Sequence, residues 1–114
     1  MFDLSKRHVL PILTGLLILG GPGSASAASL ESLTLATALG DVLASEAFCG
    51  LSYDQDAIKK FIDEHVNKND MEFSTTLRMM TDGSQYENDS MSPSEKTAHC
   101  AQIARVARSY GFIE

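Results

Sequence analysis

The residues best suited to chemistry are two cysteines and two histidines, Cys49, Cys100, His65 and His99. A reactive thiolate needs a helix N-terminus or a cationic neighbour, whereas Cys100 falls within an expected helix and Cys49 near a helix end. His99 directly precedes Cys100, and consecutive helical residues point about 100° apart, so His99 is badly placed as a base. A zinc site needs about four ligands at short spacings, and these four are scattered. We therefore expect no catalytic residue, metal site or cofactor.

A disulfide bond between Cys49 and Cys100 accounts better for both cysteines. It would close a loop of about 50 residues and stabilise the fold by roughly 4 kcal/mol in the chain-entropy model. That is a large share of the stability of a small domain, whose core alone supplies only a few kcal/mol.

The first residues have the pattern of a secretory signal peptide. Lys6 and Arg7 precede an apolar run over residues 9–20, and small residues follow at 25–27. The run is too short to span a bilayer, which needs about 20 residues. We expect cleavage after Ala27 or Ala28, which leaves one domain over residues 28–114 in the periplasm or outside the cell, with no stable membrane anchor.

The charge of the remaining chain excludes two classes of partner. Without Asp3, Lys6 and Arg7, it carries 14 acidic and 7 basic side chains, a formal net charge of −7. Nucleic acids and anionic membranes are bound through Lys and Arg, so neither is expected. The sequence also lacks the GxxxxGK[ST], GxGxxG, GxSxG and HExxH motifs.

The hydrophobic periodicity predicts an all-α fold, a small bundle of about four helices stapled by the disulfide. The first helix covers residues 30–48 and ends before Gly50. The second follows Ser52 or Asp54, either of which is a suitable cap. The last begins with the capping pattern of Ser92, Pro93 and Glu95, and Gly111 ends it.

The second helix carries a clear apolar face, formed by Ile58, Phe61, Ile62, His65 and Val66. His65 falls on the edge of this face, where a lone histidine is more often a partly buried, hydrogen-bonded core residue than a ligand.

A third helix is expected over residues 70–81, with Asn69 and Glu72 as a capping pair and Asp82-Gly83 as its end. Residues 83–91 have no periodicity and are predicted to form a loop. The helix carries four apolar residues that we take as a candidate face for a protein partner: Phe73, Leu77, Met79 and Met80. Methionine suits adaptable binding surfaces, and ordinary core filling is the alternative.

The motifs CGLSYD at residues 49–54, KTAHCAQI at 96–103 and SYGF at 109–112 resemble those of a family of small secreted proteins of alphaproteobacteria. The resemblance covers nearly all of residues 28–114 and implies export and a helical domain with two cysteines, but no activity.

In size, export and cysteine spacing the chain is also similar to the small acid-stress chaperones of the bacterial periplasm. That likeness implies a mechanism. Below about pH 3, where carboxylates are protonated, the net charge would change from −7 to about +9, and repulsion would loosen the helices and expose Phe73, Leu77 and Met80.

Together these patterns predict an exported, non-enzymatic helical protein that binds protein partners or acts under envelope stress. The alternative is an exported enzyme or metal-binding protein that uses His65, His99 and nearby carboxylates. Neither the identity of the partner nor the oligomeric state follows from the sequence.

Overall fold

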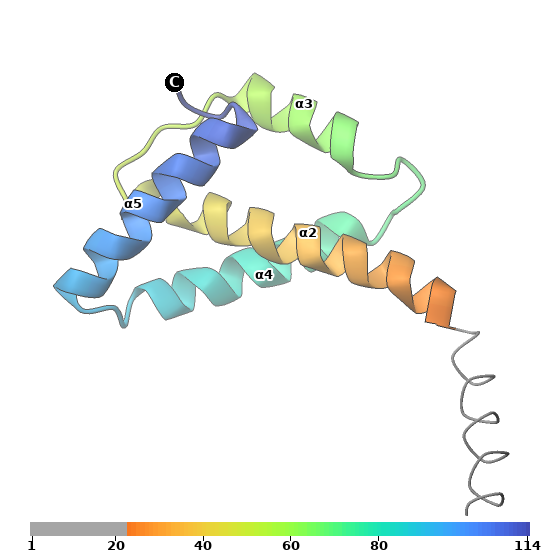
Figure 1. Ribbon diagram of the computed structural model, residues 1–114, viewed down its shortest axis with the longest axis horizontal. Coiled ribbons are helices and arrows are strands. Elements are labelled where there is room, and N and C mark those ends of the chain that lie inside the picture. The colour runs from red at the N-terminus through yellow and green to blue at the C-terminus, as the bar shows by residue number, and fades with distance from the viewer. Residues whose placement is uncertain (1–22) are drawn as a thin grey trace, which may run out of the picture. The chain divides into compact units, whose positions relative to one another are not determined.

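The protein is all-α in the part that its computed structural model describes, residues 23–114, with side chains from residue 30 on. Four helices follow one another and no strand occurs among these residues: α2 (Gly23–Phe48), α3 (Gln55–His65), α4 (Phe73–Asn88) and α5 (Pro93–Tyr110) (Figure 1). The predicted fold class is confirmed. Most of the predicted signal peptide, residues 1–27, lies outside the described residues.

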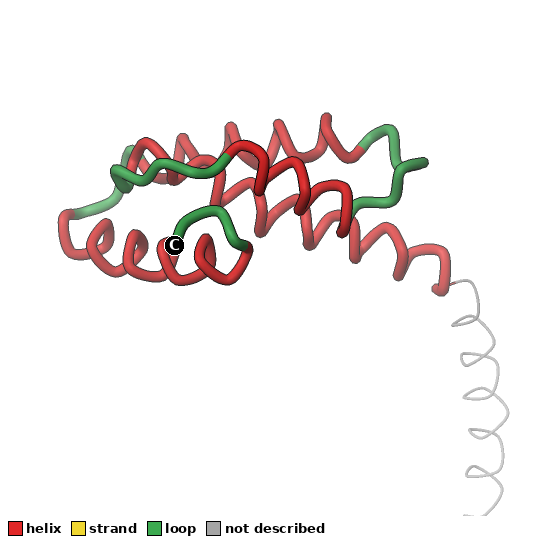
Figure 2. Tube along the Cα trace, turned by 90° about the horizontal axis from the view of Figure 1, so that it is seen from above, coloured by secondary structure: helices red, strands yellow, loops and turns green. Residues whose placement is uncertain are grey.

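Residues 32–114 form one compact unit. In this unit α2 runs between α3 and α4, and α5 crosses its C-terminal end (Figures 1 and 2). All four helices, the α2–α3 connection and the segment after α5 contribute to one hydrophobic core. Its buried members are Ala36, Leu39, Val42, Tyr53, Phe61, Phe73, Ile103, Ala107 and Phe112.

The disulfide bond joins the end of α2 to α5, as predicted. Cys49 and Cys100 are bonded, with their Cα atoms 5.4 Å apart, a separation that a disulfide spans without backbone movement. Gly50 follows Cys49 with a φ of 68°, a left-handed conformation that favours glycine and lets the chain leave α2.

Local capping signals determine where α3 and α5 begin. Of the two predicted caps of α3, Asp54 is the one used, because its carboxylate accepts hydrogen bonds from the backbone N–H groups of residues 56 and 57. Ser92 caps α5, and the reciprocal bond from its own N–H to the Glu95 carboxylate completes the predicted capping box. Gly111 ends α5 in the left-handed conformation, with a φ of 84°.

The prediction for the third helix was wrong at both ends. α4 begins at Phe73 after Glu72, whose side chain makes no capping hydrogen bond, and the Asn69 N–H bonds to Asn67 instead. At the other end α4 passes through Gly83 to Asn88, so the predicted loop over residues 83–91 is mostly helical.

Tertiary contacts explain why α4 continues past glycine. A glycine inside a helix costs only about 1 kcal/mol, and the last turn of α4 is anchored by the buried Asn88, whose side chain donates a hydrogen bond to Ser45 of α2. α2 and α4 also approach each other closely at Gly40, where a Cβ atom would lie only 2.9 Å from the Cβ of Met80.

None of the helices in the described part combines the length and the apolar character needed to cross a membrane.

Candidate functional site

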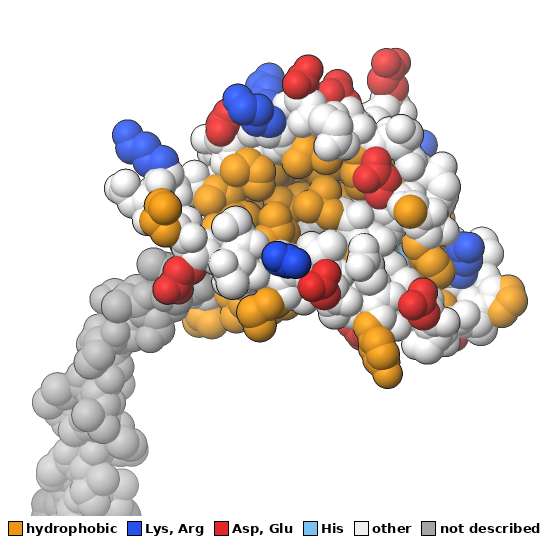
Figure 3. Space-filling model, turned by 180° about the vertical axis from the view of Figure 1, so that it is seen from behind, with side chains coloured by type: hydrophobic (Ala, Val, Ile, Leu, Met, Phe, Trp, Pro, Cys, Tyr) orange, Lys and Arg blue, Asp and Glu red, His pale blue; other side chains and the backbone are white. Residues whose placement is uncertain are grey.

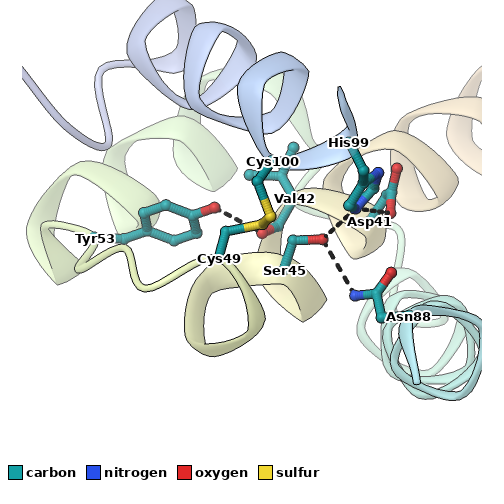
Figure 4. Close-up of polar contacts among 8 residues, drawn as sticks. All are labelled: Asp41, Val42, Ser45, Cys49, Tyr53, Asn88, His99 and Cys100. Atoms are coloured by element: carbon teal, nitrogen blue, oxygen red, sulfur yellow. Dashed lines mark hydrogen bonds and ion pairs between the residues drawn. A yellow bond between two sulfur atoms is a disulfide. The ribbon is translucent and has the colours of Figure 1, made fainter. Parts of the chain in front are cut away.

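Four polar side chains from three helices meet beside the disulfide bond, and we call them the Ser45 cluster: Asp41 and Ser45 of α2, Asn88 of α4 and His99 of α5 (Figure 4). The Ser45 hydroxyl oxygen lies 2.9 Å from His99 Nε2 and accepts a hydrogen bond of 3.3 Å from the Asn88 amide. The Asp41 carboxylate is 3.8 Å from the same His99 Nε2. The cluster thus joins α2, α4 and α5 through one serine.

Serine, histidine and aspartate are the residue types of a hydrolase triad, but the cluster is connected differently. In a triad, one imidazole nitrogen takes the serine proton while the carboxylate holds the other nitrogen. Here Ser45 and Asp41 both face Nε2. Ser45 is also completely buried, so a substrate carbonyl cannot reach its oxygen. The arrangement fits a structural junction better than an activated nucleophile.

Sequence reasoning singled out His99 and missed its partners. Asp41 and Ser45 are four residues apart on α2, a spacing that places them on one helix face, and this was the one signal available for them. The sequence predicts a loop at Asn88, and so it gives no indication that this side chain contacts α2.

Tyr53 is buried and lies on the other side of the disulfide bond from the Ser45 cluster (Figure 4). Its hydroxyl donates a hydrogen bond of 2.8 Å to the backbone carbonyl of Val42, and its own N–H bonds to the Glu46 carboxylate at 2.7 Å. Burial, with smaller contributions from the negative charges of Glu46 and Asp41, raises the pKa of the Tyr53 phenol to about 12. Tyr53 therefore remains neutral and hydrogen-bonded over the physiological pH range.

His65 occupies a different environment from His99. The sequence predicts a partly buried, hydrogen-bonded histidine, but His65 is exposed. The predicted hydrogen bond is present, since Nδ1 lies 3.0 Å from the carbonyl oxygen of Phe61. Its ring stacks on that of Phe61, with the centroids 4.2 Å apart. Among the described residues, no group of three or more His, Cys, Asp or Glu side chains is arranged to hold a metal ion.

His65 also lines a cleft of about 570 Å³. One wall is a face of α3, and the opposite wall is the end of α5, with Leu35 of α2 between them. The lining residues are Leu35, Ala57, Lys60, Phe61, Glu64, His65, Ser109, Tyr110 and Gly111.

The four residues predicted as a partner-binding face do not share one exposed surface. Phe73 is buried in the core, and Leu77 and Met80 pack against it. Met79 alone is exposed, with 64% of its surface accessible. An exposed apolar residue that the sequence does not single out is Tyr86, which is 81% exposed and lies in a part of α4 for which the sequence predicts a loop.

No protein-family model, curated protein or solved structure matches the chain. The resemblances to small secreted proteins and to acid-stress chaperones therefore stay predictions.

Proposed function

We propose that the protein is an exported, non-enzymatic helical domain that binds partly unfolded proteins through one face of α4. Support for export comes from the signal-peptide pattern of residues 1–27 and from the disulfide bond, since such bonds persist in oxidising compartments. Support for a non-enzymatic role comes from the Ser45 cluster, whose serine is buried and whose two partners face the same imidazole nitrogen.

The observation that carries the proposal is the concentration of exposed apolar side chains around α4. Within residues 32–114, the large hydrophobic side chains that are exposed are Leu33, Met71, Met79 and Tyr86. Three of these four belong to the segment from 71 to 86.

Met79, Gly83 and Tyr86 follow one another at steps of four and three residues, so they lie on one face of α4, which we call the α4 stripe. A Cβ atom at Gly83 would meet nothing within 4 Å, so a partner's backbone can approach the helix there. Methionine adapts its shape to different apolar surfaces, and tyrosine is enriched at protein interfaces.

Further hydrophobic side chains gather in a hollow on the face turned away from the viewer of Figure 1, with Lys, Arg, Asp and Glu side chains around it (Figure 3). The acidic excess of residues 28–114, a formal net charge of −7, favours partners with a net positive charge, because opposite charges speed the encounter of two proteins. The partner class that fits both features is a basic protein that exposes apolar segments.

The test is the aggregation of a basic model protein unfolded by heat, followed by light scattering with and without the oxidised protein. We expect wild-type protein to suppress aggregation and the double variant Met79→Ser/Tyr86→Ser to lose most of this effect. Ala98→Ser/Ala101→Ser, at two exposed positions of α5, is the matched control and should behave like wild type. Equal suppression by all three proteins, or none by wild type, would contradict the proposal.

A further inference from the structure

The cleft between α3 and α5 is separate from the α4 stripe, and its size and lining suit a small molecule. Its volume of about 570 Å³ lies within the 300–1,000 Å³ range typical of ligand pockets. Three small residues leave this space open: Ala57 on the α3 wall, and Ser109 and Gly111 at the end of α5. Gly111 has to be small for a second reason, because its positive φ ends the helix.

The walls of the cleft are held in place from both sides. The carbonyl of Phe112, just beyond α5, accepts a hydrogen bond of 2.9 Å from the N–H of Asp54, just before α3, and Figure 1 shows these two helix ends next to each other. Phe112 itself is fully buried in the core. The cleft is therefore largely formed before any ligand arrives, which lowers the entropic cost of binding.

Aromatic rings form a continuous group along the cleft. The ring of Phe61 lies with its centroid 4.5 Å from that of Tyr110 and 4.2 Å from that of His65, and all three residues line the cleft. Aromatic rings associate with one another in offset or edge-to-face geometry, so this group is suited to an aromatic ligand.

Two charged residues of α3, Lys60 and Glu64, add recognition of polar groups. Lys59 and Asp63, which have the same spacing one residue earlier, form an ion pair with each other at 3.8 Å. Lys60 and Glu64 line the cleft instead and make no ion pair with each other within the described part of the chain. Residues four apart on a helix are neighbours. A ligand that pairs with both Lys60 and Glu64 must therefore have its own carboxylate and ammonium groups close together.

We infer that this cleft binds free aromatic α-amino acids. The aromatic side chain would lie against Tyr110 and His65, whose rings are less buried than that of Phe61. The α-carboxylate would pair with Lys60, and the α-ammonium would pair with Glu64. An α-amino acid has its ammonium and its carboxylate group attached to the same carbon, which matches the neighbouring positions of Lys60 and Glu64 on α3. Because the cleft is open and both charges are solvated, we expect a dissociation constant on the order of 1 mM for tryptophan.

The experiment is a titration of the oxidised protein with tryptophan, followed by the amide chemical shifts in ¹H–¹⁵N correlation spectra. We expect saturable shifts that centre on Lys60, Phe61, Glu64 and Gly111. N-acetyltryptophanamide and tryptophan-containing dipeptides lack the adjacent pair of charges, and they should bind about fivefold or more weakly.

Matched variants separate the cleft from the rest of α3. Lys60→Gln should weaken tryptophan binding about two- to fivefold, whereas Lys59→Gln should leave it unchanged. Ser109→Leu, at an exposed position, should fill the cleft and abolish the saturable shifts while the circular dichroism stays that of wild type. The absence of saturable shifts in wild type, equal binding of the uncharged analogue, or equal effects of Lys59→Gln and Lys60→Gln would overturn the inference.

Discussion

Two glycines inside helices should respond differently to the same substitution. Alanine is favoured over glycine in a helix interior by about 1 kcal/mol, and this gain applies to both Gly40→Ala and Gly83→Ala. At Gly83 the new methyl group would meet nothing within 4 Å, so the variant should be more stable than wild type by about 1 kcal/mol.

At Gly40 the same methyl group would lie 2.9 Å from the Cβ of Met80 and 3.0 Å from the backbone nitrogen of Thr81. These atoms cannot rotate away, so α4 as a whole must shift. Overpacking of this kind costs about 1 to 3 kcal/mol, which cancels or exceeds the gain in helix propensity. The free energies of unfolding of the two variants should therefore differ by about 1 to 3 kcal/mol, with Gly83→Ala the more stable.

Urea unfolding of the oxidised proteins at neutral pH, followed by circular dichroism, measures this difference directly. The slope of the free energy against urea concentration should be the same for both variants and wild type, because the surface exposed on unfolding is unchanged. If Gly40→Ala stabilises the protein as much as Gly83→Ala does, then α2 and α4 do not pack closely at this point, and the described position of α4 is wrong.

Three further predictions concern the disulfide bond, the α5 cap and the buried phenol. Removing the bond in Cys49→Ser/Cys100→Ser should lower the free energy of unfolding by about 4 kcal/mol, since it closes a loop across 51 residues, and unchanged melting would refute its structural role. Ser92→Ala should cost about 1 kcal/mol in urea unfolding through the lost cap. The hydrogen bond from the Ser92 N–H lowers the pKa of the Glu95 carboxyl. The stability that this bond contributes is therefore present above the ordinary pKa of glutamate and is lost as the pH falls through the lowered pKa of Glu95. If Glu95→Gln loses stability at low pH in the same way as wild type, this prediction is wrong. The pKa of Tyr53 is raised to about 12, so the stability linked to its neutral phenol is fully present below pH 10 and is lost as the pH rises through 12. Tyrosinate absorbance should show this late ionisation in wild type but not in Tyr53→Phe.

The parts of the fold that sequence reasoning predicted are those determined by short-range signals. The capping box of α5 is contained in four consecutive residues, and the end of α2 depends on Gly50 directly after Cys49. The disulfide was predictable despite its range, because two cysteines allow one intramolecular pairing.

The errors lie where contacts between distant residues outweigh local preference. Gly83 is a reasonable helix end in isolation, but Asn88 reaches Ser45, which is 43 residues earlier in the chain, and keeps the last turn of α4 helical. The Ser45 cluster depends on a contact between residues 54 positions apart, and periodicity within one helix carries no information on such a contact. The cleft likewise arises from how α3 and the end of α5 meet.

One paired measurement decides whether the folded protein binds clients through the α4 stripe. Near- and far-ultraviolet circular dichroism and client aggregation would be recorded on the same samples from pH 7 down to pH 2. We expect that clients are protected at pH 7, while the tertiary signal is intact, and that Met79→Ser/Tyr86→Ser removes this protection. Protection that appears only after the tertiary signal is lost would contradict it, and would instead assign binding to Phe73, Leu77 and Met80, which are covered in the folded protein.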